Sequence, residues 1–245
     1  MPLPVPRVAK LAGAAALDLL FPRQCHGCGA KPEEERFLCW ECRADADFIG
    51  APYCSQCGDP VPGHIDHEYL CSFCSRHKPA FDLARSAVRY RGLVGEAIRN
   101  IKYGCATWLI PDLVDLLEAC MATHYDLLPV DAVCYVPLYP VRERARGFNQ
   151  AQWLATELVA RRKLPRPRPF LRRIKDTGTQ TRLTASQRMA NVTGVFEVNR
   201  SHAIRGQRLL LVDDVMTTGA TVNECARVLK RAGAASVHVI TVARG

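Results

Sequence analysis

The sequence lacks the signals of several common protein classes. No apolar run approaches the roughly 18 residues of a membrane-spanning helix, so we expect none. No Gly-Lys pair occurs, which excludes the phosphate loop of nucleoside triphosphatases, and no Gly-x-Gly-x-x-Gly turn for a dinucleotide is present. With 48% apolar and 23% charged residues, the 245-residue chain has the composition of a globular protein with one sizeable core and a small additional module.

The N-terminal apolar stretch has only part of the pattern of a signal peptide. Basic residues precede the apolar residues 11–21, as they do in a signal peptide. Asp18 interrupts the stretch, however, and its apolar residues fit one face of an amphipathic helix that Pro22 would stop. We therefore expect a helix that packs on the body of the protein, with a signal peptide as the alternative.

The net charge of +9 is concentrated in one part of the chain. Residues 142–188 contain 13 Lys and Arg against 3 Asp and Glu, whereas residues 1–80 contain 8 against 10. A phosphate-bearing ligand explains part of this basic excess. Nucleic acid or an anionic surface could bind the remainder.

Eight of the twelve cysteines form four Cys-x-x-Cys pairs. Two such pairs separated by 10–13 residues have the spacing of a tetrahedral Cys₄ zinc site. Gly29 and Gly58 each follow the second cysteine of a pair, as in zinc knuckles. Sequential pairing predicts two structural zinc sites, the first with Cys25, Cys28, Cys39 and Cys42 and the second with Cys54, Cys57, Cys71 and Cys74.

Other interpretations of these thiols stay open. Interleaved pairing fits the same spacing, and a redox or iron–sulfur role is an alternative to zinc. A disulfide framework is the least favoured interpretation, since it requires an oxidising compartment. Residues 25–79 are polar and bury little apolar surface, so metal would supply most of the folding energy of this module. We expect the other four cysteines to be small buried hydrophobes; they are Cys105, Cys120, Cys134 and Cys225.

Residues 209–221 are the most informative segment. An apolar run predicts a buried strand of parallel type that ends on two adjacent carboxylates, Asp213 and Asp214. Such sheets bind ligands at the carboxyl ends of their strands. A loop of small hydroxyl residues and Gly219 follows, and the spacing of apolar residues then predicts a helix. Backbone N–H groups of such a loop bind phosphate and carboxylates accept hydrogen bonds from a diol, so the segment predicts a ribose 5-phosphate site.

This segment resembles the phosphoribosyl-pyrophosphate (PRPP) motif of type I phosphoribosyltransferases, in which apolar residues precede Asp-Asp-x-x-Thr-Thr-Gly-x-Thr. The resemblance implies an α/β fold with a parallel sheet flanked by helices, and PRPP bound together with Mg²⁺. The alternative, the strand end of a nucleoside triphosphatase, would require the missing Gly-Lys loop. The resemblance assigns PRPP binding to Asp213, Asp214, Val215, Met216, Thr217, Thr218, Gly219, Ala220 and Thr221.

Further motifs are similar to those of the ComF family of bacterial proteins linked to natural competence. In chain order they are Leu-Leu-Phe-Pro before the first Cys-x-x-Cys, Arg-Gly-Phe-Asn-Gln-Ala, and Gln-Thr-x-Leu-Thr-x-x-Gln-Arg. The resemblance spans residues 17–244 and implies a cytoplasmic protein. One departure is that family members commonly have Pro-Leu-His-Pro-Arg where this chain has Tyr139 and Val141.

The remaining segments predict the elements of such a fold. We expect a strand or hairpin at residues 81–90 and a second central strand at 132–138. Helices are expected at residues 92–103, 107–125 and 148–163, and a further parallel strand at 236–243. A loop that carries Arg142, Arg144 and Arg146 is expected after the second strand. In the resembled fold this loop holds the pyrophosphate; a solvated basic face is the alternative.

Residues 172–191 are polar and basic. In the resembled fold they correspond to a mobile hood that closes over PRPP and excludes water from the oxocarbenium character that develops at ribose C1. The hood candidates are Lys175, Gln180 and Arg188. The alternative is a surface loop that leads into a short helix at residues 185–191.

These features predict a double zinc-ribbon module at residues 17–80 and a phosphoribosyltransferase-like domain at residues 81–245. The resemblance implies a PRPP-binding transferase whose acceptor and general base no motif identifies. The alternative is a non-catalytic PRPP sensor, in which the zinc module and the basic face bind single-stranded DNA or proteins of DNA uptake.

Overall fold

The computed structural model describes residues 23–32, 36–177, 191–199 and 204–245. The predicted N-terminal helix lies outside these residues, as do Gln180 and Arg188 of the predicted hood. The chain divides into two compact units, one that ends at Asp45 and one that extends from Ala46 to Gly245. Among the described helices, none combines the length and the apolar character needed to span a bilayer.

The smaller unit consists, in its described part, of a cysteine turn and the short helix α2 (Trp40–Ala44). The turn closes through hydrogen bonds from the Cys25 N–H to the Ala30 carbonyl (2.7 Å) and from the Gly29 N–H to the Cys25 carbonyl (2.9 Å). Gly29 has a φ of 75°, which a side chain would disfavour. The unit is therefore a short, turn-rich segment whose shape depends on its cysteines.

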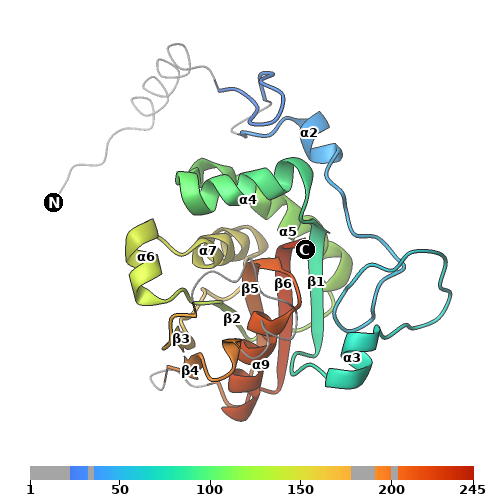
Figure 1. Ribbon diagram of the computed structural model, residues 1–245, viewed down its shortest axis with the longest axis vertical. Helices are drawn as coiled ribbons and strands as arrows, with labels where there is room; N and C mark the ends of the chain where they lie inside the picture. The colour runs from blue at the N-terminus through green and yellow to red at the C-terminus, as the bar shows by residue number, and fades with distance from the viewer. Residues whose placement is uncertain (1–22, 33–35, 178–190, 200–203) are drawn as a thin grey trace. The chain divides into compact units, whose positions relative to one another are not determined.

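A parallel sheet in the order β1–β6–β5–β2 forms the centre of the larger unit (Figure 1). Its strands are β1 (Leu83–Arg89), β2 (Ala132–Tyr135), β5 (Arg208–Met216) and β6 (Ser236–Arg244). The two central strands, β5 and β6, are buried along most of their length. Such nearly continuous burial is typical of a parallel sheet covered on both faces. The α/β class and the parallel strand at residues 236–243 are thereby confirmed.

Helices cover both faces of this sheet (Figure 1). Helix α5 (Ile110–His124) packs on β1 and β6, and α7 (Gln150–Arg162) packs on β2 and β5 beside it. Helix α9 (Ala220–Arg231) covers the other face together with an antiparallel pair, β3 (Leu171–Arg173) and β4 (Phe196–Val198). Side chains of a strand alternate between faces, so Leu209 and Leu211 contact the apolar side of α9.

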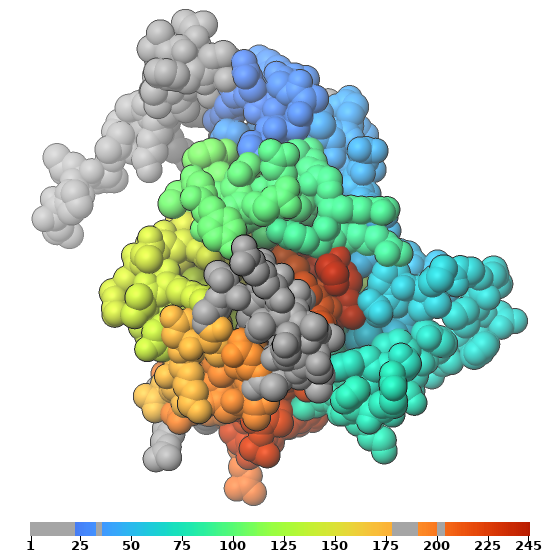
Figure 2. Space-filling view, viewed as in Figure 1, coloured from blue at the N-terminus to red at the C-terminus, as the bar shows by residue number. Residues whose placement is uncertain are grey.

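The other elements of the larger unit are short or lie at the ends of the sheet. They are α3 (Ser72–His77), α4 (Gly92–Gly104), the 3₁₀ turn η1 (Thr107–Leu109) and α6 (Pro140–Arg146). Helix α4 lies near the carboxyl ends of the strands, where the C-terminal end of β6 reaches the surface (Figures 1 and 2). The predicted helices at residues 92–103, 107–125 and 148–163 thus correspond to α4, to η1 with α5, and to α7.

Two predictions about residues 132–146 are wrong. The predicted second central strand, β2, lies at the edge of the described sheet and pairs only with β5. It is shorter than expected because Pro137 has no N–H with which to continue the pairing. The predicted arginine loop is the helix α6, since Pro140 suits the first turn of a helix and Gly147, with a φ of 84°, ends it.

Candidate functional site

The segment at residues 209–221 forms the expected strand, loop and helix. Strand β5 continues two residues beyond Asp214, because Val215 and Met216 pair with the last residues of β6. The loop from Thr217 to Gly219 then leads directly into α9. The carboxylates therefore lie inside the last part of the strand rather than at its end.

The loop itself has a tight conformation that depends on glycine. Gly219 has a φ of 76°, and a Cβ atom there would lie 2.8 Å from the Met216 Cε. The Thr218 hydroxyl accepts a hydrogen bond from the Ala220 N–H (3.4 Å), at the first turn of α9. Residues 215–222 line a cavity of about 20 Å³. This hollow has room for about one water-sized group and lies at the helix N-terminus, where backbone N–H groups favour an anion.

Both carboxylates are buried and face different sides of β5. Asp213 Oδ1 accepts the Asp214 N–H (2.9 Å), and Asp214 Oδ1 accepts the Val215 N–H (2.9 Å). Asp214 Oδ2 lies 2.6 Å from the Nζ of Lys102, on α4. On the other side, the positive charge of Arg173, on β3, lies near Asp213. Cations from two separate elements therefore face the carboxylate pair.

Burial and mutual repulsion perturb the protonation of this group. Burial raises the pKa of Asp213 well above its ordinary value, and the charge of Asp214 adds to this effect. Burial alone would lower the pKa of Lys102, but the charges of Asp214 and Asp213 outweigh it and the pKa is raised. Burial and the charge of Arg142 lower the pKa of the Arg173 guanidinium. The site is thus a compact set of titratable groups, in which the two aspartates are buried and Lys102 and Arg173 are partly buried.

The three arginines of the predicted pyrophosphate loop have different surroundings on α6. Arg142 forms an ion pair with Asp176 (3.1 Å), directly after β3. Arg146 donates a hydrogen bond to the Gln150 side chain on α7. Arg144 and the hood candidate Lys175 are exposed. Only Arg142 is therefore placed beside the segment that carries Arg173.

Asn149, which belongs to the Arg-Gly-Phe-Asn-Gln-Ala motif, fixes the start of the helix that follows these arginines. The Asn149 side chain caps α7, because its Oδ1 accepts hydrogen bonds from the Ala151 N–H (3.0 Å) and the Gln152 N–H (3.4 Å). Its Nδ2 also donates to the Val136 carbonyl at the end of β2 (3.1 Å). The side chain is buried, so it joins the start of α7 to the carboxyl end of the sheet.

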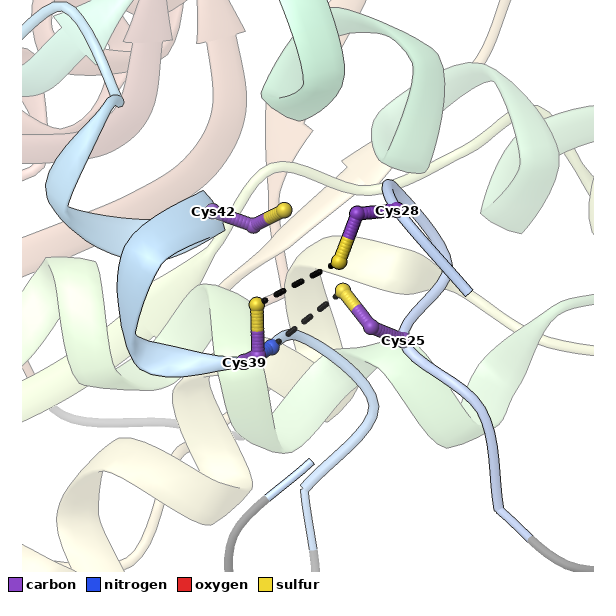
Figure 3. Close-up of side chains that lie close together, drawn as sticks. All are labelled: Cys25, Cys28, Cys39 and Cys42. Atoms are coloured by element: carbon purple, nitrogen blue, oxygen red, sulfur yellow. Dashed lines mark hydrogen bonds between the residues drawn. The ribbon is translucent and has the colours of Figure 1, made fainter. Parts of the chain in front are cut away.

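The thiols form two sequential tetrads, as the simplest pairing predicts. Within each tetrad the four Sγ atoms lie within 4.8 Å of one another. A tetrahedral zinc ion with Zn–S bonds of about 2.3 Å requires Sγ atoms about 3.8 Å apart. The Cys28–Cys39 and Cys57–Cys71 Sγ distances are 3.6 and 3.7 Å. Figure 3 shows the first tetrad, whose thiols point toward a common centre. The donor set and its size fit structural zinc at both sites.

Backbone donors favour the thiolate at the first cysteine of each tetrad. Burial opposes ionisation of Cys25, but backbone N–H groups donate to its sulfur and lower its pKa to about 6. The same balance lowers the pKa of Cys54 to about 7. Burial raises the pKa of Cys57 to about 12, in spite of the positive charge of Arg244. Since the thiolate is the metal ligand, bound zinc would hold all four thiols of a tetrad deprotonated.

Sequence reasoning missed Lys102 and Arg173. Lys102 follows Ile98 by four residues, so it lies at the margin of the buried face of α4. A lone lysine beside an apolar face was the available signal. Arg173 lay within a basic stretch and gave no such signal. The interpretation of Cys105 as buried is wrong, because this residue ends α4 with a φ of 52° and is exposed; the other isolated cysteines, Cys120, Cys134 and Cys225, are buried.

Two protein-family models match this chain, one in its N-terminal part and one in its C-terminal part. A family model described as a double zinc ribbon domain matches residues 16–76, and one described as a phosphoribosyl transferase domain matches residues 145–245. The chain is 32% identical over 212 residues to Competence protein F of Haemophilus influenzae, across 84% of this chain and 90% of that protein. The chain belongs to the ComF family.

Two further relatives match over similar shares of this ComF chain. The DNA utilization protein YhgH of Escherichia coli strain K12 is 29% identical over 227 residues, which cover 84% of this chain and 96% of that protein. Competence protein ComFC of Bacillus subtilis is 28% identical over 226 residues, with 87% and 86% covered. The resemblance found in the sequence motifs is thereby confirmed across most of the chain.

Proposed function

We propose that this ComF chain binds Mg²⁺–PRPP at the β5–α9 loop and acts as a phosphoribosyltransferase on an acceptor yet to be identified. One observation carries the proposal. Two buried carboxylates, Asp213 and Asp214, lie in the last part of β5, two residues before a loop whose N–H and hydroxyl groups lie at the start of helix α9. Acceptors for a sugar diol thus lie beside donors for a phosphate.

Each part of the site has a role in this proposal. Thr217, Thr218 and Thr221, with the first N–H groups of α9, bind the 5-phosphate. Asp213 and Asp214 accept hydrogen bonds from the ribose 2′- and 3′-hydroxyls. Mg²⁺ neutralises charge on the pyrophosphate when it is bound. In the reaction the bond from ribose C1 to the pyrophosphate oxygen breaks, a nucleophile of the acceptor bonds to C1, and pyrophosphate leaves.

Calorimetry with Mg²⁺–PRPP tests the binding site. We expect Asp214→Asn to lose about 1.5–3 kcal/mol of binding free energy, because it removes charge-assisted hydrogen bonds to the ligand. Asp131→Asn is the matched control, since Asp131 pairs with Arg208 at the opposite, amino end of β5. Equal PRPP affinity in the parent and in Asp214→Asn would contradict the assignment, as would absence of binding to the parent.

Turnover requires a separate measurement. Pyrophosphate release from PRPP in the presence of a panel of bases and other nucleophiles would identify the acceptor class. PRPP binding without release for any acceptor would favour the alternative, a ComF protein that senses PRPP without catalysis.

A role in DNA binding is the second candidate, and the names of the relatives, which refer to competence and to DNA utilization, favour it. The charge of the basic segment is, however, partly neutralised. Acidic residues outside residues 142–188 pair with three of its arginines; the pairs are Arg161 with Asp115 and Glu118, Arg162 with Asp126, and Arg172 with Glu197. We therefore expect weak binding to single-stranded DNA that falls steeply with salt.

A further inference from the structure

The buried pair of carboxylates needs a positive charge to stay ionised, and α4 supplies one. Lys102 lies in the last turn of α4, more than 100 residues before β5 in the sequence. Its Nζ approaches Asp214 Oδ2 to 2.6 Å, and the lysine side chain is only 20% exposed. Among the described residues, Asp214 Oδ2 accepts no hydrogen bond of good geometry. The ammonium of Lys102 is therefore its main electrostatic partner.

The alternation of β5 gives the two carboxylates different neighbours. Asp214 faces the side from which α4 brings Lys102. Asp213 faces α9 and β3, where the nearby titratable groups are the buried Cys225 thiol and the Arg173 guanidinium. Arg142 and Asp176, which form an ion pair, contribute further charge around Arg173. Lys102 thus differs from the cations beside β3 because it is in direct contact with a carboxylate oxygen of the Asp213–Asp214 pair.

We infer that Lys102 is a positioning residue of the ribose site, whose ammonium holds the Asp214 carboxylate and favours ionised acceptors at the Asp213–Asp214 pair for the ligand's hydroxyls. An ionised carboxylate only accepts hydrogen bonds, whereas a protonated one must use one oxygen as a donor. Two carboxylates in adjacent buried positions otherwise share a proton, because their like charges oppose full ionisation. The inference rests on the proposed function, since it concerns how the same site binds ribose.

The test is the affinity for Mg²⁺–PRPP between pH 6 and pH 9 in the full-length, zinc-loaded protein. For the parent we expect a weaker pH dependence than for Lys102→Met, because the Lys102 charge lowers the pKa of Asp213 relative to the variant. For Lys102→Met we expect weak binding at pH 6 that improves by about tenfold per pH unit, because each ligand bound must displace one proton. The sign follows from the chemistry: the charge of Lys102 lowers the pKa of Asp213, so its removal raises that pKa further and an ionised acceptor is lost as pH falls.

Two further variants separate positioning from a general effect on folding. Lys102→Arg keeps the charge and should restore the pH dependence of the parent. Lys230→Met is the matched control, since Lys230 pairs with Asp82 (2.9 Å) away from the β5–α9 loop. It should bind PRPP like the parent at every pH. Melting temperatures recorded at the same pH values show that each variant is folded.

The outcomes distinguish the inference from the proposed function. If the parent binds PRPP and Lys102→Met binds equally well from pH 6 to pH 9, the inference is wrong and the proposed function stands. A loss of affinity that is the same at every pH also overturns it, because Lys102 would then contact the ligand directly. If the parent does not bind PRPP at any pH, the proposed function fails. Should Lys102→Met not fold, Lys102→Arg decides: affinity that falls more steeply with falling pH than the parent's contradicts the inference, because the positive charge is kept.

Discussion

The two cysteine tetrads have the same local geometry in different surroundings. In each, the N–H of a glycine after the second cysteine donates to the first cysteine's carbonyl at 2.9 Å; these glycines are Gly29 and Gly58. In each, the third cysteine, Cys39 or Cys71, precedes a short helix. The first tetrad belongs to the small unit that ends at Asp45, whereas the second belongs to the larger unit that contains the sheet.

The second tetrad is joined to the free edge of β1. The Ala84 N–H donates to the Gln56 carbonyl (2.8 Å), and the Arg85 guanidinium donates to the Ser55 carbonyl (2.9 Å). Its four cysteines are part of the same apolar cluster as Phe81 and the α9 side of the sheet. By contrast, Cys28 of the first tetrad is exposed. The second knuckle therefore covers an edge strand that would otherwise present unpaired backbone groups.

This difference shows that one sequence motif can have two structural roles. In the small unit, zinc would supply most of the folding energy, because so little apolar surface is available there. In the larger unit, the second tetrad also covers the β1 edge of the sheet. Strand β5 of the same sheet leads into the β5–α9 loop. Loss of zinc from the first tetrad should therefore affect only the small unit. Loss of zinc from the second tetrad should also affect the candidate site.

The largest expected effect is on Cys57→Ser compared with Cys28→Ser. Structural zinc binding contributes on the order of 10 kcal/mol in small zinc modules, so loss of one of four thiolates should release the metal and unfold what depends on it. We expect Cys57→Ser to abolish the cooperative melting transition of the larger unit. Cys28→Ser should leave that transition unchanged. Both variants should retain about one zinc ion.

Calorimetry combined with elemental analysis measures both quantities in the same samples. Equal effects of the two substitutions on the main transition would show that the tetrads are energetically equivalent. An intact main transition in Cys57→Ser would show that the sheet does not depend on the second tetrad.

A smaller effect is expected for Gly58→Ala compared with Gly29→Ala. Both glycines have a left-handed backbone, with φ values of 67° and 75°, so each substitution should cost about 1–2 kcal/mol. A Cβ at Gly58 would also lie 2.7 Å from the Ala84 carbonyl oxygen, whereas nothing lies within 4 Å of one at Gly29. This contact should destabilise the larger unit by a further 1–3 kcal/mol or so.

Chemical denaturation of the two variants, followed through the main transition, checks this difference. The comparison fails if both alanines shift that transition equally, because the clash with β1 would then be relieved without cost.

Most strands and helices could be predicted from the spacing of their apolar residues, because each of these segments keeps the same kind of burial along its length. The apolar run at residues 209–212 and the helical spacing after Gly219 gave β5 and α9. One error arose where neighbours in space decide, because the edge position of β2 depends on which strands pair with it. The other was a misjudged local signal: the helix α6 depends on Pro140 and Gly147, whose effects outweighed the arginines between them.

The candidate sites were predictable only where their residues are consecutive or follow a fixed spacing. The motif from Asp213 to Thr221 is a continuous segment, and the cysteine tetrads follow a fixed spacing. Lys102 and Arg173 come from α4 and β3, and only the folded chain brings their charges to the carboxylates. No local pattern records such a contact. The roles of these residues toward PRPP stay predictions.

The smallest expected effect concerns Arg244, which connects the second tetrad with the strand pair that leads to the β5–α9 loop. Its side chain is largely buried; Nη1 donates to the Cys57 carbonyl (3.2 Å), and Nε donates to Asp59 (3.1 Å). Its backbone pairs with Met216, the last residue of β5.

Arg244→Met should destabilise the larger unit by about 1.5–3 kcal/mol, because hydrogen bonds of a charged donor are lost. It should also speed zinc release to a chelator without changing the zinc content, since no metal ligand is altered. Arg172→Met is the matched control, because Arg172 forms an exposed ion pair with Glu197 (2.8 Å) and such pairs contribute about 0–1 kcal/mol. If both variants release zinc at the parent's rate, Arg244 does not support the second tetrad, and the hydrogen bonds to β1 alone join it to the sheet.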